Sequence, residues 1–326
     1  MAEELKLKSI KVSKLLEIDE NQNFLMGFEV LAGGAGLDKD ITCPEINRPG
    51  LTLSGFMEHF ASERIQVLGR GEVAYIEKLI SDNETENIEN FFKYDIPVCI
   101  VTHGQSIPQY VMDFADMRSI PVLRTKQSTE KFIALITTIL EDLFASYVVF
   151  HGNFVSIYNI GVMILGPSGI GKSESVLGLV ERGHKFISDD MVRVKKLRTP
   201  SGFELKGEPY VDYGPYIEIR GIGIINVSQY YGEGRVLNFE HLGLVVNLIE
   251  WRSDYNYDRL GMEEKYQNIL GLDIPMKEIP VSSGRNVPLL IEVAAYREVM
   301  RRLGYNSAEE LERKVINFMK KERELE

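Results

Sequence analysis

A glycine-rich stretch of the sequence runs Gly166-Pro167-Ser168-Gly169-Ile170-Gly171-Lys172-Ser173 and matches the pattern G-x-x-x-x-G-K-[ST] in full. An apolar run, 162–165, precedes it and suits a buried strand, and the residues that follow, 174–182, suit a helix. Glycines let such a loop curl so that successive backbone N–H groups face phosphate oxygens, and the helix N-terminus adds partial positive charge. Lys172 is expected to reach the β- and γ-phosphates of a nucleotide, and Ser173 to offer its hydroxyl to Mg²⁺. The sequence therefore predicts a nucleotide phosphate site on a strand–loop–helix unit.

Two carboxylates, Asp189 and Asp190, follow the phosphate loop closely, at the end of the strand-like run 186–188. Carboxylates in this place can hold Mg²⁺ or accept a proton from an attacking hydroxyl. Because successive strand residues face opposite sides, at most one of the two is expected to face the phosphates. The alternation alone does not say which.

Composition narrows the class of protein. The chain has 326 residues, of which 44% are hydrophobic, and single cores usually divide near this length, so two domains are expected. The 37 basic and 48 acidic side chains give a net charge of −11, which argues against nucleic acid or an anionic membrane as a partner. No stretch approaches the ~18 consecutive apolar residues of a membrane span. Cys43 and Cys99 form neither a disulfide nor a zinc pattern, which fits a cytoplasmic location.

The pattern of apolar residues predicts an α/β protein with two domains. Residues 1–127 mix short apolar runs with helical patterns and form an accessory α/β domain, in which the glycine-rich run 32–36 is interpreted as a turn. Residues 128–145 carry apolar side chains at three- and four-residue spacing, which predicts a linking helix capped by Ser128. Residues 146–326 are expected to form the P-loop domain, with helices at its C-terminal end.

Further runs join the phosphate loop and the acidic pair. They are Ile217-Glu218-Ile219-Arg220-Gly221-Ile222-Gly223-Ile224-Ile225-Asn226-Val227 and Tyr257-Asp258-Arg259-Leu260-Gly261. Together these motifs resemble the bacterial HPr kinase/phosphorylase family, the HPr serine kinases, whose signature is the run that begins near Glu218. In motif terms the resemblance extends from about His151 to Arg297, and the order and spacing of the elements fit the whole chain.

The resemblance implies an enzyme of carbon catabolite repression that uses ATP and Mg²⁺ to phosphorylate a serine of HPr, the phosphocarrier protein of the sugar phosphotransferase system. It also implies the reverse task, in which inorganic phosphate attacks the phosphoserine and pyrophosphate leaves. In such enzymes the C-terminal domain is the kinase and resembles the phosphoenolpyruvate carboxykinase core. Their subunits form a hexamer, so HPr and further copies of the chain are the expected partners.

Catalytic roles follow from the same resemblance. Asp190 matches the family's catalytic aspartate, which is the general base in phosphorylation and the general acid in the reverse direction. His151 matches a histidine of the catalytic group upstream of the phosphate loop. Arg259 matches an active-site arginine whose task would be to neutralise charge on the transferring phosphoryl group.

The resemblance also implies that Glu218 is a second position for Mg²⁺, beside Ser173. If the signature run forms a strand, Glu218 and Arg220 share one face while Ile217 and Ile219 point into the core. The alternation predicts a charged wall of the active site.

The family's loop for dephosphorylation, Pro-Val-x-Pro-Gly-Arg-Asn, is represented by Pro280-Val281-Ser282-Ser283-Gly284-Arg285-Asn286. Ser282 stands where a basic residue is usual, and Ser283 replaces the proline. The loss of one cation weakens the case for binding the attacking phosphate, whereas Gly284 and Arg285 keep the anion-binding character. The sequence therefore supports the kinase more strongly than the phosphorylase.

Two other functions are compatible with a P-loop. A P-loop kinase or carboxykinase-like enzyme acting on a small metabolite would use the N-terminal half as its substrate domain. A nucleotide-gated sensor or scaffold would bind ATP without catalysis, although Asp190 and Glu218 argue against it. Labelled ATP in a cell extract separates the two kinases by whether the label enters a small protein or a small molecule.

Overall fold

The structure is a computed structural model that describes residues 3–21, 25–254 and 264–306, together with residues 310, 313, 314 and 316. Its contacts divide the chain into two compact units, an N-terminal unit of Lys6–Ala145 and a C-terminal unit that begins at Ser146 and also includes the first residues through Leu5. Leu5 and Tyr147 exchange two backbone hydrogen bonds of 2.8 and 2.9 Å. The sequence gives no sign of this pairing between its start and the C-terminal unit.

A five-stranded sheet with the order β2-β7-β6-β5-β4 forms the centre of the N-terminal unit. The strands are β2 (Glu29–Ala32), β4 (Ile46–Asn47), β5 (Ile65–Leu68), β6 (Cys99–Val101) and β7 (Val122–Arg124), and β1 (Ile10–Lys11) pairs separately with β3 (Asp40–Ile41). Strands β4 to β7 run parallel, while β2 is antiparallel to β7. Because parallel neighbours need crossover connections, helices separate these strands in the chain.

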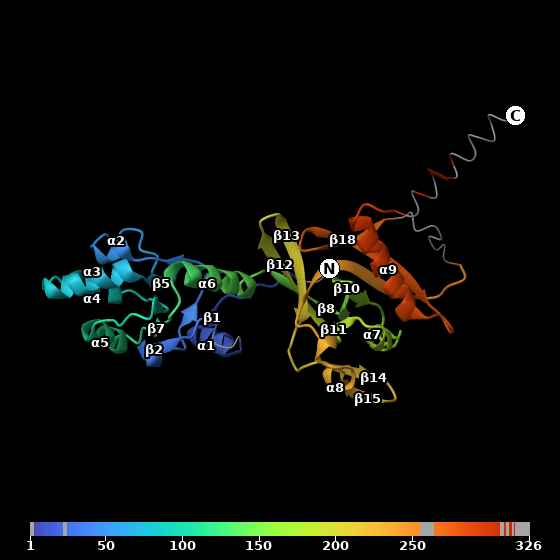
Figure 1. Ribbon diagram of the computed structural model, residues 1–326, viewed down its shortest axis with the longest axis horizontal. Helices are drawn as coiled ribbons and strands as arrows, with labels where there is room; N and C mark the ends of the chain where they lie inside the picture. The colour runs from blue at the N-terminus through green and yellow to red at the C-terminus, as the bar shows by residue number, and fades with distance from the viewer. Residues whose placement is uncertain are drawn as a thin grey trace. The chain divides into compact units, whose positions relative to one another are not determined.

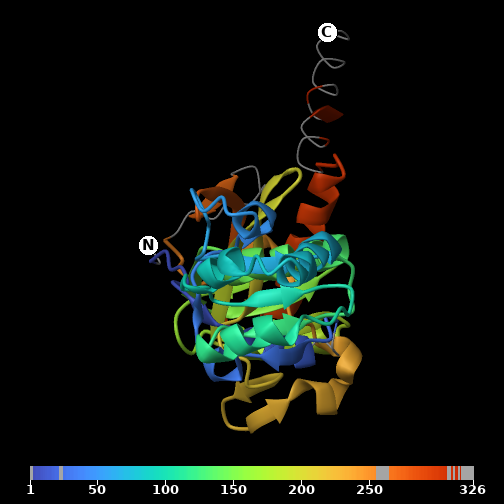
Figure 2. The same ribbon diagram turned by 90° about the vertical axis from the view of Figure 1, so that its left-hand side faces the viewer.

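Helices cover both faces of this sheet, as the three layers in Figure 1 show. One face carries α2 (Gly50–Leu53), α3 (Arg70–Ser81), α4 (Glu86–Phe92) and α5 (Gln109–Met117), and the other carries α1 (Val12–Asn21) and α6 (Thr129–Leu143). Figure 2 views this unit with α3, α4 and α5 nearest the reader. Successive side chains of a strand point to opposite faces of the sheet, so each face has its own core. Leu68 of β5 packs with the first group of helices, and its neighbour Val67 packs with the second. The predicted helix after Ser128 is confirmed as α6, whose Lys131 N–H donates to the Ser128 hydroxyl at 3.4 Å.

A nine-stranded sheet is the frame of the C-terminal unit. Its strands are β8 (Tyr147–His151), β9 (Asn153–Ile157), β10 (Ile160–Leu165), β11 (Lys185–Ser188), β12 (Met191–Thr199), β13 (Gly202–Pro209), β16 (Glu240–Glu250), β17 (Lys265–Ile269) and β18 (Leu272–Val281). The main path runs β11-β9-β10-β16-β13-β12-β8, and β18 joins β16 and β17. Strands β10, β16 and β18 run parallel, so their carboxyl ends meet at one edge of the sheet.

Helices α7 (Lys172–Glu181) and α9 (Val287–Arg302) pack on one face of this sheet. The same core includes side chains of a two-stranded hairpin, β14 (Tyr216–Ile219) and β15 (Gly223–Asn226), and of the helix that follows it, α8 (Val227–Tyr231). A second core gathers side chains from β8, β9, β12 and β13, so the sheet curls and packs against itself. The predicted strand 162–165 is confirmed as part of β10, and the predicted helix 174–182 is confirmed as α7, which begins two residues earlier and ends at Glu181, with Arg182 as its C-cap. The α/β class predicted from the sequence is confirmed in both units.

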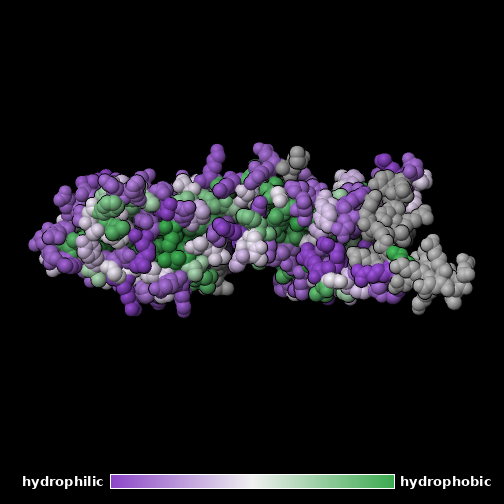
Figure 3. All heavy atoms as spheres, turned by 90° about the horizontal axis from the view of Figure 1, so that it is seen from above, coloured by the Kyte–Doolittle hydropathy of each residue, from purple (hydrophilic) through white to green (hydrophobic). Residues whose placement is uncertain are grey.

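Hydrophilic side chains dominate the face of the molecule in Figure 3, with hydrophobic atoms exposed in small patches between them. Among the described residues, no helix combines the length and the apolar character that crossing a membrane requires.

Candidate active site

The predicted phosphate loop connects the carboxyl end of β10 to the first residue of α7, Lys172. Gly166 has φ +146°, and a Cβ there would lie 2.7 Å from the carbonyl oxygen of Leu248. Gly171 has φ +97° and precedes α7 without any side-chain hydrogen bond that caps the helix. Glycine is required at both positions, by a close backbone approach at the first and by a left-handed conformation at the second. The loop therefore presents the N-terminus of α7 uncapped.

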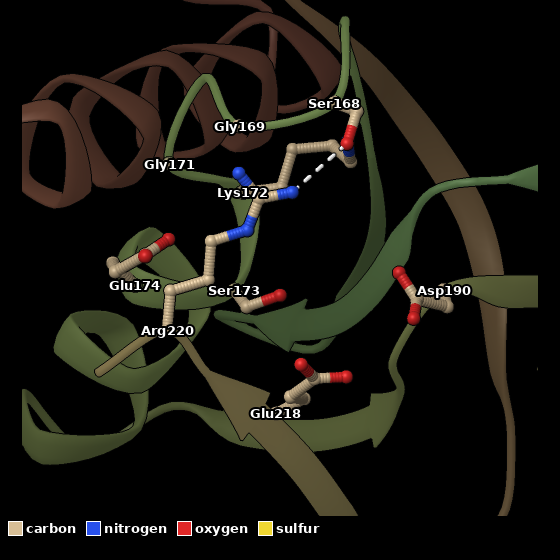
Figure 4. Close-up of a pocket in the computed structure, with 9 residues that line it drawn as sticks. All are labelled: Ser168, Gly169, Gly171, Lys172, Ser173, Glu174, Asp190, Glu218 and Arg220. Atoms are coloured by element: carbon tan, nitrogen blue, oxygen red, sulfur yellow. Dashed lines mark hydrogen bonds between the residues drawn. The ribbon is translucent and has the colours of Figure 1, made fainter. Parts of the chain in front are cut away.

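A pocket of about 170 Å³ lies over this loop. Its lining, drawn in Figure 4, consists of Ser168, Gly169, Gly171, Lys172, Ser173, Glu174, Asp190, Glu218 and Arg220. Pockets that enclose a drug-sized ligand are larger, about 300–1,000 Å³. The pocket therefore suits phosphate groups and a metal ion rather than a whole nucleotide.

Two cations extend over the loop. The Lys172 ammonium donates to the carbonyl oxygens of Gly166 and Pro167 at 3.0 and 3.2 Å. The Arg220 guanidinium donates to the Ser168 hydroxyl at 3.1 Å, the contact dashed in Figure 4. Because phosphate oxygens are stronger acceptors than a carbonyl or a hydroxyl, both side chains are placed to exchange these contacts for a bound phosphate.

The structure separates the acidic pair that follows β11. Asp190 is exposed on the pocket wall and adopts φ +63°, and its carbonyl oxygen accepts a hydrogen bond from the Gly152 N–H at 2.9 Å. Asp189 instead points beneath the pocket, where its carboxylate accepts hydrogen bonds from the side chains of Ser173 and Asn153 and from the Glu218 N–H. Of the two carboxylates only Asp190 lines the pocket, so the structure distinguishes residues that strand alternation alone left equivalent.

Burial raises the pKa of the Asp189 carboxyl to about 6, and the charge of Asp190 acts in the same direction, whereas the hydrogen bonds from Glu218, Ser173 and Asn153 oppose the shift. From the sequence, Asp189 is one of two candidates to face the phosphates, and Asn153 is not a candidate for the site. The hydrogen bonds of these two side chains join segments 16 to 36 residues apart, so no local sequence pattern predicts them.

The signature run forms the hairpin of β14 and β15, in which Glu218 pairs with Ile224. Ile217 and Ile219 are 1% and 4% exposed, whereas Glu218 is exposed and lines the pocket, so the predicted alternation is confirmed. Arg220 follows the strand and lines the pocket as well.

The oxygen donors in this pocket fit Mg²⁺. The Ser173 hydroxyl and the Glu218 carboxylate both line it, and hard cations take oxygen ligands. No group of three or more His, Cys, Asp or Glu side chains with metal-binding geometry occurs among the described residues. Proteins usually hold Mg²⁺ through one or two side chains together with waters and substrate phosphates.

Two further predicted positions, His151 and the 280–285 loop, lie outside the pocket lining. His151 is exposed at the end of β8, paired with Met191, one residue before the Gly152 that contacts the Asp190 main chain. The 280–285 loop leaves β18 at the same sheet edge as the phosphate loop, and Arg285 donates to the Pro280 carbonyl at 2.9 Å. Arg259, with the whole run 257–261, lies outside the described residues.

A P-loop that faces carboxylates across a phosphate-sized pocket is the arrangement of a phosphoryl-transfer enzyme. Matches to protein-family models identify the family within this class. The HPr Serine kinase N terminus matches residues 10–140, and the HPr Serine kinase C-terminal domain matches residues 142–315. The chain belongs to the HPr kinase/phosphorylase family.

Known proteins agree with the family models. The HPr kinase/phosphorylase of Thermoanaerobacter sp. (strain X514) is 42% identical over 291 residues, which cover 89% of this chain and 94% of the relative. That of Treponema pallidum (strain Nichols) is 39% identical over 306 residues, or 94% of this chain and 95% of the relative. The solved structure of the Hpr(Ser) kinase/phosphatase from Coxiella burnetii matches 50% of this chain and 97% of that one, with 34% identity and a TM-score of 0.45.

Proposed function

We propose that this protein phosphorylates a serine of HPr with ATP and Mg²⁺ and, in the reverse direction, dephosphorylates phosphoseryl-HPr with inorganic phosphate to give pyrophosphate. The pocket in which the phosphate loop faces Asp190 and Glu218 is the observation that carries the proposal. Membership of the HPr kinase/phosphorylase family supports both activities and the protein substrate. A small-metabolite kinase, which the P-loop alone would allow, is not favoured by these relatives.

Asp190 is the proposed general base. Its carboxylate takes the proton of the seryl hydroxyl while the serine oxygen bonds to the γ-phosphorus and the bond from that phosphorus to ADP breaks. In the reverse direction an oxygen of inorganic phosphate attacks the phosphorus of phosphoserine, and Asp190 returns the proton to the departing serine oxygen. Its exposure on the pocket wall supports access by a protein-borne hydroxyl.

Charge on the phosphates is met by the chain's own cations and by the metal. Lys172 is proposed to bind the β- and γ-phosphates, and the position of Arg220 over the loop suits the same charges. Ser173 and Glu218 are proposed to hold Mg²⁺, which when bound would neutralise charge on the phosphate oxygens. Arg259 and His151 are added to this group on the family resemblance.

The remaining assignments are also proposals. The 280–285 loop is assigned to the reverse reaction, which its place at the sheet edge of the phosphate loop supports. Functionally, 1–127 is proposed as accessory, 128–145 as linking and 146–326 as catalytic. The family resemblance supports a homo-oligomer, a hexamer, working in the cytoplasm.

The test incubates the protein with HPr, ATP and Mg²⁺, beside HPr whose target serine is replaced by alanine. Label from the γ-phosphate should enter the first HPr and not the second, and added inorganic phosphate should then release it as pyrophosphate. A protein that binds ATP yet transfers nothing to HPr would be a nucleotide-gated sensor. Transfer to a small molecule in a cell extract would instead indicate the metabolite kinase.

A further inference from the structure

A polar side chain is buried directly beneath the phosphate pocket. Asn153 begins β9, all five residues of which are buried, and it is 0% exposed. Its Nδ2 donates to Asp189 Oδ1 and also, at 3.5 Å, to the hydroxyl oxygen of Ser173. Its Oδ1 has no hydrogen-bond partner within the part of the chain that the structure describes.

The stability of the core does not account for this amide. A buried polar atom without a partner costs about 1–3 kcal/mol. Valine suits a buried strand position and carries no polar atom, so it would avoid that cost at residue 153. What the asparagine supplies and valine cannot is the hydrogen bond to Asp189.

Asp189 is the point at which several parts of the site are joined. Its Oδ1 accepts from the Ser173 hydroxyl at 3.0 Å, and its Oδ2 accepts from the Glu218 N–H at 3.2 Å. The two partners are the residues whose oxygens line the pocket as candidate Mg²⁺ ligands. With Asn153 as the third donor, one carboxylate connects β9, the start of α7 and β14.

We infer that Asn153 is a positioning residue for Mg²⁺ binding and acts through Asp189. By holding Asp189 Oδ1 in place, it keeps the acceptor to which Ser173 donates its hydroxyl hydrogen, and beside the 3.5 Å contact from Asn153 this leaves one lone pair of the Ser173 oxygen for the metal. The same carboxylate fixes the backbone from which the Glu218 side chain projects. The inference rests on the proposed function, because it takes Ser173 and Glu218 as the metal ligands.

The experiment compares Asn153→Val with Ser156→Ala, a control substitution on the same strand. The hydroxyl that Ser156→Ala removes donates to Glu240 at 2.9 Å and makes no hydrogen bond to Asp189. Binding of a fluorescent ATP analogue is titrated with Mg²⁺ in the absence of HPr, and unfolding by urea is measured in parallel. Asn153→Val removes the unpartnered Oδ1 and a donor to Asp189 together, so its stability should differ little from that of the unmodified protein, and it should bind the analogue equally without Mg²⁺. Its apparent Mg²⁺ affinity should fall about 10- to 100-fold, while that of Ser156→Ala should not change.

A second comparison separates positioning from packing. Asp189→Asn should weaken Mg²⁺ binding as well, and adding Asn153→Val to it should cause little further loss, because both changes break one chain of contacts. An unchanged Mg²⁺ dependence in Asn153→Val, or full additivity of the two changes, overturns the inference. Because no step needs HPr, a failure to phosphorylate HPr would count against the proposed function alone.

Discussion

Both units begin a helix where a parallel strand ends, but they treat the exposed N–H groups of that helix differently. In the N-terminal unit β5 leads through Gly69 into α3, and the Glu72 carboxylate folds back to accept from the Gly69 N–H at 3.0 Å. Arg48 forms an ion pair with the same carboxylate at 2.9 Å. In the C-terminal unit β10 leads through the glycine loop into α7, and no described side chain caps that helix.

The difference explains why the edge of α7, and not that of α3, is the proposed phosphate site. A helix N-terminus attracts an anion in either unit, but at α3 the anion is a side chain of the protein itself, and Arg48 is already paired with it. Around α7 the cations Lys172 and Arg220 donate hydrogen bonds to neutral oxygens of the loop, and neither forms an ion pair within the described residues. We therefore expect phosphate binding to depend on which donors and cations the fold leaves without an anionic partner.

The largest effect is expected from Lys172→Ala. The substitution removes the ammonium that the loop holds over the pocket, so both nucleotide binding and stabilisation of the transferring phosphoryl group should suffer. We expect kcat/KM for HPr phosphorylation to fall by about 10⁴-fold. Transfer of labelled phosphate, with circular dichroism to verify folding, measures it. If nucleotide binding survived in a folded variant, Lys172 would not be the cation that distinguishes this edge from that of α3.

Asp190→Ala should have the next largest effect. The carboxylate faces the pocket but caps nothing, so its loss should slow the proton transfer without weakening ATP binding. General bases contribute about 10²–10⁴-fold, and we expect a fall in kcat of about 10³-fold. Steady-state kinetics with HPr and a separate titration of ATP measure the two quantities. Glu181→Ala, an exposed change at the far end of α7, is the control and should leave both unchanged.

The sequence predicted the parts of this site that are local. The phosphate loop and the first turn of α7 are contiguous, and the exposure of Glu218 follows from strand alternation around Ile217 and Ile219. The glycine-rich run 32–36 was rightly interpreted as backbone geometry, since a Cβ on Gly33 would lie 1.9 Å from the carbonyl oxygen of Ile120.

What could not be predicted depends on contacts across the fold. Asp189 and Asp190 are adjacent and chemically identical, and only the packing of β9, α7 and β14 around Asp189 sets them apart. The Leu5–Tyr147 pairing has the same character, because it joins the start of the chain to an edge strand more than a hundred residues away. Periodicity describes one segment at a time and carries no information about which segments meet.

Ser168→Asp tests whether the start of α7 is suited to phosphate because its N–H groups and cations have no anionic side chain as a partner. The new carboxylate would stand where Arg220 now donates to the Ser168 hydroxyl at 3.1 Å, and would give the loop an internal anion of the kind that Glu72 supplies to α3. ATP affinity should fall about 10- to 100-fold, the weight of one or two charge-assisted hydrogen bonds. Ser168→Asn, of equal size but neutral, should lose far less. Equal losses in the two variants, measured by titration with ATP, would mean that bulk and not charge governs the loop.

The smallest effect is expected from removing the carboxylate that caps α3 in the N-terminal unit. Glu72 is 8% exposed, and Glu72→Ala would leave the Gly69 N–H without its acceptor and Arg48 without its ion pair. Since Arg48 is half exposed, water can solvate it, and most of the cost should come from the lost helix cap, about 1–2 kcal/mol of unfolding free energy. Urea denaturation measures this cost, with Glu77→Ala, an exposed position of α3, as the control that should change nothing. ATP affinity should stay the same in both variants, because uncapping α3 creates neither a glycine loop nor a counterpart of Lys172. If Glu72→Ala proved as stable as Glu77→Ala, the carboxylate would not be satisfying the helix, and self-capping could not explain why this edge differs from the phosphate loop.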